Sequence, residues 1–314
     1  FSSSRILDTY LSKFISKRFN DVKSPKILFI SLCTCNLLNN VMFKVKSDFL
    51  YEIYLSKDKK INIPMDTLMK QLEESSTKTI ELKSADYETF FVLGFMKIGQ
   101  GKFDEAQRLL KHSVVLNTQY PPANYNLAYA EYMLKNYDQA IVEAKKAFDL
   151  YQDNIQKIDP LRLVSYTFDI QNQTDSALFY LDKALEVSPK NAEVLLDKLY
   201  ISIRENLTVQ EKIIIEIILL NPESPEVYNS VIEAYQSTGD SYQPFLTVLQ
   251  DLEKIYPENA KIMGNINFYQ GQIYFETNIP LAKEHFLLAQ TYFMKILPEE
   301  HEVFSVIKMY LEAK

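Results

Sequence analysis

Few residues in this chain of 314 have the types and spacing that enzymes use for chemistry. The three histidines, His112, His285 and His301, lie far apart, and none falls in a zinc-binding spacing such as H-E-x-x-H. Glycine-rich phosphate loops and the G-x-S-x-G nucleophile motif are absent from the sequence. Paired carboxylates are numerous, but they fall where helix starts and solvated helix faces place them. The sequence therefore predicts a protein without enzymatic activity, cofactor or bound metal.

The two cysteines, Cys33 and Cys35, are separated by a single residue. Such near neighbours seldom form a disulfide, because the geometry of the bridge is demanding. They are interpreted as small apolar residues of a helix, with binding of a soft metal as an alternative. A lipoprotein-type signal ending at Cys33 is a further alternative, although Leu32 stands where such a signal has a small residue.

A cytoplasmic location is favoured, and the alternative is the cell envelope or a membrane-associated state.

The composition is that of a globular protein, with 47% hydrophobic and 24% charged residues. The chain has only 6 glycines, against roughly 22 at average usage. This scarcity argues against doubly wound nucleotide-binding folds and β-barrels, which depend on tight turns. Tryptophan is absent, whereas 21 tyrosines and 19 phenylalanines are present. These values predict a helical protein rich in aromatic residues.

Charge is unevenly distributed along the chain, whose net charge is −7. Residues 1–85 carry 14 basic and 9 acidic side chains, and residues 86–314 carry 20 basic and 32 acidic ones. The acidic total argues against binding to nucleic acid. The asymmetry predicts two functional zones, or a basic cap on an acidic body.

Residues 86–297 contain an internal repeat. Gly94 and Ala128 are 34 residues apart, and so are Ala106 and Ala140. Steps of 34, 37, 33, 35 and 37 residues separate the copies of one position, which is usually small: Ala106, Ala140, Ala177, Gln210, Phe245 and Ala282. A tandem period of this length is typical of stacked helical pairs.

A proline that ends the second helix of a pair recurs as well, because its ring clashes with the preceding turn. It stands at Pro189, Pro222, Pro257 and Pro298. Together these features resemble the tetratricopeptide repeat family, although Gln210 and Phe245 depart from its small residue. The resemblance is carried by Leu93, Gly94, Lys97, Ala106, Leu110, Leu127, Ala128, Ala140, Ala144, Ala147, Leu178, Leu181, Ala184, Pro189, Gly271, Tyr274, Ala282, Phe286 and Ala289.

The resemblance implies an all-α fold, a right-handed superhelix in which helical pairs stack as a solenoid. Six repeats are expected over residues 86–297, followed by a capping helix over residues 298–314. One pair cannot bury its apolar face alone, so neighbouring pairs share a continuous core. The small residues let the two helices of a pair approach closely.

Residues 1–85 are predicted to form degenerate helical repeats or a cap. Apolar residues at helical spacing predict helices over residues 4–19, 25–38 and 41–56. Alternating apolar residues over 49–63 would instead give a β-hairpin, so a partly β region is the alternative to the favoured helix.

A further helix is expected over residues 66–74, with a polar linker over residues 75–83. The basic, amphipathic segment 4–19 is interpreted as a packing helix, with contact to a membrane surface as the alternative.

In the family that the chain resembles, the first helix of each pair lines a concave binding surface. Only Asn126 and Arg162 are comparable to the clamp by which some members hold a terminal carboxylate, which argues against a receptor for chaperone tails. In later copies of the repeat, the corresponding inward positions are Leu195, Leu199, Phe268 and Phe275. The candidate partner-binding residues are Phe91, Phe95, Tyr125, Asn126, Tyr129, Tyr132, Arg162 and Tyr166.

An aromatic groove of this kind suits an extended, apolar or proline-containing peptide, or a helix of a partner. For each aromatic residue the alternative is packing between adjacent repeats. The predicted function is a non-enzymatic scaffold for protein–protein interaction. The alternative is a membrane-associated accessory subunit of an assembly, secretion or transport complex, docked through the basic N-terminal region.

Overall fold

The computed structural model describes residues 43, 44, 46–48, 50, 51, 65–81, 83 and 85–313. Every regular element among these residues is an α-helix, so the predicted all-α fold of the tetratricopeptide-repeat solenoid type is confirmed. The chain divides into two compact units, unit 1 (residues 1–167) and unit 2 (residues 168–314). The predicted domain boundaries at residues 85 and 297 remain predictions.

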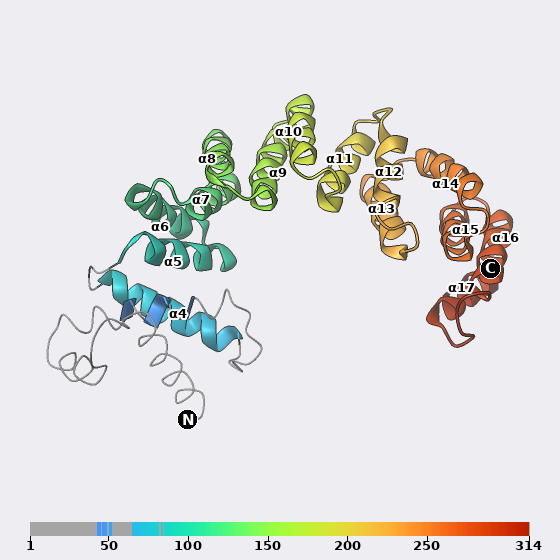
Figure 1. Cartoon of the computed structure of the whole chain (residues 1–314), viewed down its shortest axis with the longest axis horizontal. Coiled ribbons are helices and arrows are strands. Elements are labelled where there is room, and N and C mark those ends of the chain that lie inside the picture. Colours follow the sequence, from blue (N-terminus) through green and yellow to red (C-terminus); the bar gives the residue numbers. More distant parts are fainter. Residues whose placement is uncertain are drawn as a thin grey trace, which may run out of the picture. The chain divides into compact units, whose positions relative to one another are not determined.

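Unit 1 consists of helices that pack on their neighbours in the sequence (Figure 1). Helix α5 packs against α6, α6 against α7 and α7 against α8. The helices are α4 (Met65–Glu81), α5 (Tyr87–Gly99), α6 (Phe103–Leu116), α7 (Pro121–Met133), α8 (Tyr137–Leu150) and α9 (Asn154–Ile170), the last of which ends just beyond the unit.

In unit 2, α11 packs against both α12 and α13, and α12 packs against α14. The most extensive helix contact of the unit joins α15 to α16. Helix α17 packs on α16 through the buried side chain of Ile307. The helices are α10 (Thr174–Val187), α11 (Ala192–Arg204), α12 (Gln210–Ile218), α13 (Pro225–Thr238), α14 (Gln243–Ile255), α15 (Ala260–Phe275), α16 (Ile279–Phe293) and α17 (Glu302–Glu312).

The turns inside successive helical pairs share one backbone conformation. Gly101, Lys135, Asn172 and Asn206 have φ of 71°, 64°, 57° and 50°. In each turn, the N–H of the residue with positive φ donates to the carbonyl three residues earlier. The N–H of the following residue donates to the carbonyl five residues before it, and all these N···O distances are 2.8–2.9 Å. These bonds satisfy carbonyls that the helix end leaves unpaired. Because asparagine tolerates the left-handed region, the turn does not need glycine in every copy, which fits the low glycine content.

Close approach within the first pair depends on Gly94 of α5. A Cβ atom at this position would lie 2.7 Å from Cγ of Leu110 in α6. Leu110 and Ala106, which also face α5, are fully buried. The equivalent small residues Ala140, Ala177 and Ala282 are fully buried too.

In unit 2, larger side chains replace the small residue of the repeat without leaving buried polar groups unpaired at that position. Gln210 is 5% exposed, and its Nε2 donates to the carbonyl of Ser202 at 3.2 Å. Its Oε1 accepts the Tyr235 hydroxyl at 2.8 Å. Phe245 is fully buried in the apolar core. These two departures from the family pattern are therefore accommodated by a hydrogen-bonded amide and a packed ring.

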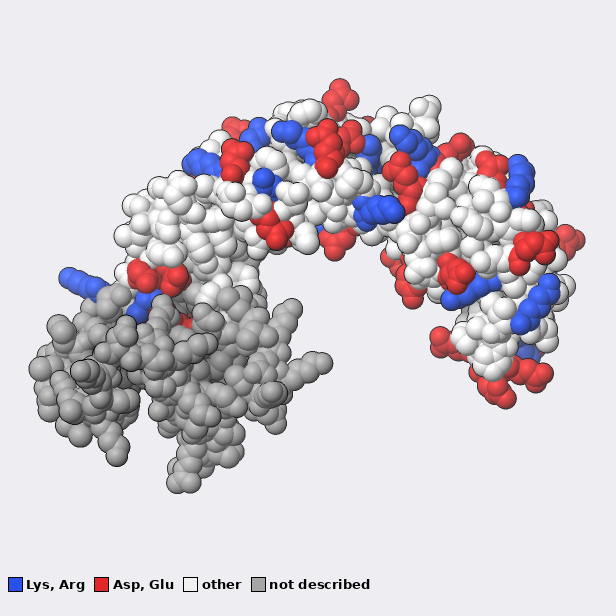
Figure 2. Space-filling model, viewed as in Figure 1, with Lys and Arg blue, Asp and Glu red and all other residues white. Residues whose placement is uncertain are grey.

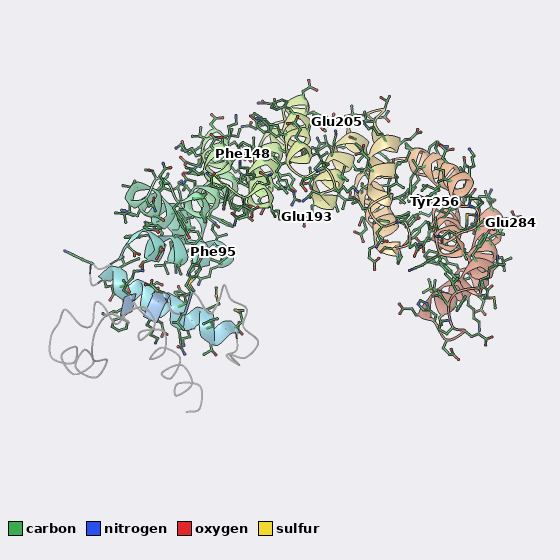
Figure 3. The ribbon with its side chains drawn as sticks, viewed as in Figure 1. Phe95, Phe148, Glu193, Glu205, Tyr256 and Glu284 are labelled. Atoms are coloured by element: carbon green, nitrogen blue, oxygen red, sulfur yellow. The ribbon has the colours of Figure 1, made fainter. Side chains whose placement is uncertain are left out.

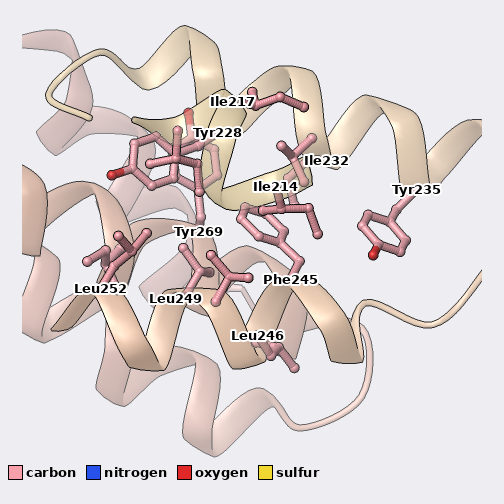
Figure 4. Close-up of a cluster of buried hydrophobic side chains, with 14 of the residues drawn as sticks. Ile214, Ile217, Tyr228, Ile232, Tyr235, Phe245, Leu246, Leu249, Leu252 and Tyr269 are labelled. Carbon is pink, nitrogen blue, oxygen red and sulfur yellow. The ribbon is translucent and has the colours of Figure 1, made fainter. Parts of the chain in front are cut away.

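Two tyrosines form the centre of the unit 2 core (Figure 4). The rings of Tyr228 in α13 and Tyr269 in α15 are stacked, with centroids 5.1 Å apart and planes 5° apart. Their hydroxyls donate to the carbonyls of Pro222 at 2.8 Å and Pro225 at 2.9 Å. Burial of a phenol is costly unless its hydroxyl is paired, so the backbone before α13 is positioned by the core.

The structure corrects one expectation for the N-terminal region. Residues 75–81, predicted as part of a polar linker, continue α4 as helix. Ser75, Ser76 and Thr79 are buried, and their hydroxyls bond internally; Oγ of Ser76 lies 2.7 Å from Oγ of Ser47. A small hydroxyl side chain that bonds within the fold can be buried like an alanine. Polarity alone therefore misidentified this segment.

The described residues between 43 and 51 are helical, which agrees with the favoured helix and not with a hairpin strand there. The predicted segments 4–19 and 25–38, and most of the 49–63 hairpin, lie outside the described residues. So do Cys33 and Cys35.

Replacing Gly94 tests the close approach of α5 and α6. We expect Gly94→Ala to lower the free energy of unfolding by about 1–2 kcal/mol, because overpacking outweighs the gain in helix propensity. Urea denaturation followed by circular dichroism measures this change. The control is Gly99→Ala, since an added Cβ there meets no atom within 4 Å. Equal stability of the two variants would contradict the close approach.

Candidate functional site

A row of tyrosines lies along one side of α7. Tyr125, Tyr129 and Tyr132 follow each other at spacings of four and three, and all three are half-buried. The opposite side of α7, with Ala123 and Leu127, is in the core. Helical periodicity thus separates a core stripe from an aromatic stripe on the same helix.

Two of these tyrosines contact the aromatic ring of the first residue of a neighbouring helix, α6 or α8. The centroid of Tyr129 lies 6.4 Å from that of Phe103, at an interplanar angle of 70°. Tyr132 lies 6.1 Å from Tyr137, at 54°. These contacts hold the aromatic side chains of α7 in place, which lowers the conformational entropy that a bound partner would have to restrict.

Phe91 and Phe95 of α5 have different environments, although both were predicted to bind a partner. Phe91 is 4% exposed and packs against Tyr51, Phe95 and Tyr120. Phe91 is therefore a core residue, in agreement with the alternative that such rings pack between adjacent repeats. Phe95 (Figure 3) is only half-buried, so part of this residue remains accessible.

The polar candidates are engaged within the chain. Nη2 of Arg162 in α9 donates to the Tyr166 hydroxyl at 2.8 Å, and the guanidinium carbon lies 5.7 Å from the centroid of that ring. Nδ2 of Asn126 donates to the carbonyl of Pro122 at 2.8 Å. An arginine and an asparagine already paired in this way are poorly placed to clamp a terminal carboxylate.

Electrostatics links the α7 tyrosines to α9. Burial raises the pKa of Tyr125 to about 12, and the negative charge of Asp159 adds to the shift while Arg162 opposes it. Tyr125 therefore lies near Asp159 and Arg162 of α9. We call Phe95, Tyr125, Tyr129, Tyr132, Arg162 and Tyr166 the aromatic face.

A second set of tyrosines, which is not among the predicted binding residues, lies beside the aromatic face. Tyr87, Tyr120 and Tyr151 stand at or just before the first helix of three consecutive pairs, 33 and 31 residues apart. The rings of Tyr87 and Tyr120 are 5.1 Å apart at 65°. Burial raises the pKa of Tyr151 to about 12, and the negative charge of Asp159 adds to this shift. The repeat spacing was the signal that could have revealed this set.

The predicted inward residues of unit 2 are mostly structural. Leu195 and Leu199 are buried in the core. The rings of Phe268 and Phe275 pack against Tyr310 of α17, with centroids 6.5 Å and 5.0 Å away.

The parts of the chain that the structure describes contain no group of three or more His, Cys, Asp or Glu side chains able to hold a metal ion. His112 stacks on Phe90 and His285 on Tyr274. Burial lowers the pKa of His285, whose Nδ1 lies 3.2 Å from Oδ1 of Asn267. Among the same residues, no helix combines the length and apolar character needed to cross a membrane.

Comparison with known proteins identifies the type of repeat. The family model described as tetratricopeptide repeat matches residues 97–158, a segment that contains α6, α7 and α8. Comparison with curated proteins found no match.

Several solved structures are similar in fold. A tetratricopeptide repeat protein from Parabacteroides merdae is 19% identical, with a TM-score of 0.50 over 87% of this chain and 98% of that one. PilF of Pseudomonas aeruginosa is 11% identical, with a TM-score of 0.47 over 71% and 95%. YrrB, described as a TPR protein with an unusual peptide-binding site, is 17% identical, with a TM-score of 0.42 over 61% and 97%.

The raised pKa values of Tyr125 and Tyr151 predict a pH dependence of stability. Free tyrosine ionises near pH 10, whereas these two residues ionise near pH 12 in the folded chain. Folding thus favours the neutral phenols. Their contribution is complete below about pH 10 and is lost as the pH rises from about 10 to 12.

Carbon-13 NMR of ring-labelled tyrosine measures both titrations, with Tyr125→Phe and Tyr151→Phe for assignment. Asp159→Asn should lower both pKa values, because it removes a nearby negative charge. Ionisation of both residues near pH 10 in the folded chain would refute the burial described here.

Proposed function

We propose that the chain, which matches the tetratricopeptide-repeat family model over residues 97–158, is a non-enzymatic scaffold for protein–protein interaction that binds its partner on the aromatic face of unit 1. The observation that carries this proposal is the half-exposed aromatic stripe of α7, flanked by Phe95 on α5 and by Arg162 and Tyr166 on α9. The fold needs the opposite side of α7 for its core and leaves this side only partly covered.

The chemistry of the aromatic face favours a particular kind of partner segment. Tyrosine offers a large contact area together with a polar hydroxyl, and it loses little conformational entropy on binding. Rings of this kind suit the apolar or proline-containing side chains of an extended peptide, or the apolar side of a helix. The hydroxyls and the nearby carboxylate of Asp159 supply hydrogen bonds to the partner's backbone or polar side chains.

The double variant Tyr129→Ala, Tyr166→Ala tests the aromatic face. We expect partner affinity to fall about 100-fold or more, because truncating central aromatic residues commonly costs 2 kcal/mol or more each. Affinity purification from the native source followed by mass spectrometry identifies the partner, and calorimetry with the purified partner measures the loss. Circular dichroism confirms that helicity is retained.

The control variant is Phe179→Ala, Tyr200→Ala, which removes two aromatic rings that are 55% and 39% exposed and lie outside the aromatic face. It should bind the partner as the unmodified chain does. Unchanged binding of the partner by the Tyr129→Ala, Tyr166→Ala variant would contradict the proposed site.

A further inference from the structure

Unit 2 contains a groove that is separate from the aromatic face. A cavity of about 580 Å³ lies between the turn from α13 to α14 and the end of α15. A second cavity of about 270 Å³ lies among α13, α15 and α17. The two cavities share Gln236, Tyr242, Ile273 and Glu276 in their walls, so they are adjacent, and together they are called the groove.

The sequence builds this groove from the side of α13 that the core leaves free. Asn229, Glu233 and Gln236 follow at spacings of four and three and line the groove, whereas Tyr228 and Val231 are fully buried in the core. Helical periodicity fixes both stripes at once. The groove side of α13 is therefore mainly polar, whereas its core side is apolar.

Aromatic rings form part of the groove wall. Tyr242 packs against Tyr235, with centroids 5.3 Å apart. Tyr310 of α17 packs against Phe275, with centroids 5.0 Å apart at 75°. Nε2 of Gln272 lies 3.4 Å from the Tyr310 hydroxyl. These contacts hold the wall in place while leaving Tyr242 and Tyr310 half-buried.

The charge of the groove is negative and uncompensated. Glu233, Asp240 and Glu276 line it, no lysine or arginine does, and none of the three carboxylates has an ion-pair partner among the described residues. Burial and the charge of Glu276 raise the pKa of Tyr242. Unit 2 as a whole carries 22 acidic and 11 basic side chains, and acidic side chains predominate on its visible surface in Figure 2.

We propose that this acidic groove binds an extended peptide segment of a partner that carries a lysine or arginine next to an apolar residue. The cation would lie between Glu233 and Glu276, where charge complementarity favours it. The rings of Tyr242 and Tyr310 offer cation–π contact or cover for the apolar neighbour. The carboxamides of Asn229, Gln236 and Gln272 both donate and accept, so they can pair with an extended backbone.

The test uses the full chain and a random peptide library displayed on phage. We expect the enriched peptides to contain a lysine or arginine beside an apolar residue. Fluorescence anisotropy with one enriched, labelled peptide then measures binding to the variant Glu233→Gln, Glu276→Gln. Affinity should fall roughly tenfold or more, because two charge-assisted contacts are lost.

Salt gives a second measure of the same contacts. Affinity should fall steeply between low and high salt, since the screening length shrinks from about 30 Å at 0.01 M to about 3 Å at 1 M. The control variant Glu258→Gln, Glu284→Gln has the same change in charge at exposed positions outside the groove, and it should bind like the unmodified chain.

The outcomes separate this proposal from the aromatic face. The Tyr129→Ala, Tyr166→Ala variant should bind the basic peptide normally, because its changes lie in unit 1. Equal binding by the Glu233→Gln, Glu276→Gln variant, or a selection that yields no basic peptides, would overturn the acidic groove. So would self-association of the chain that this variant abolishes, because a second copy would then be the occupant.

Discussion

The close packing of neighbouring helices, seen most directly between α5 and α6, is the constraint on which the rest of the structure depends. Where Gly94 faces Leu110, no space remains for a side-chain carbon, and the second helix meets the first through fully buried small residues such as Ala106. This contact fixes which side of each helix is covered. The remaining sides are left for neighbouring pairs or for solvent, so the position of every candidate binding residue follows from it.

The abundant aromatic residues divide into two populations as a consequence. Those on covered sides, such as Tyr228 and Tyr269, stack in the core and direct their hydroxyls to backbone carbonyls. Those on uncovered sides, such as Tyr125 and Tyr129, remain half-buried and are held by contacts with neighbouring rings and charges. The same residue type therefore stabilises the fold in one environment and offers a contact surface in the other.

The two units present surfaces of different chemistry from the same repeat. In unit 1 the accessible side of α7 is aromatic, and its polar neighbours Asn126 and Arg162 are engaged within the chain. In unit 2 the accessible side of α13 carries a carboxylate and amides, and Glu276 adds negative charge beside them. A repeat scaffold can vary its exposed stripe freely, because the residues that stack the pairs lie on other sides of the helices.

The sequence by itself determined the repeat, the helical class and the residues that share a helix side. The near-constant spacing of the six copies from Ala106 to Ala282 indicated the repeat, because stacked helical pairs recur at a fixed period. Only the tertiary structure separated buried Phe91 from half-buried Phe95, and only it extended α4 to Glu81. It also brought residues of α13, α15 and α17 to one groove. Periodicity states which residues face the same way, but the neighbour that covers them is set by packing between segments distant in the sequence.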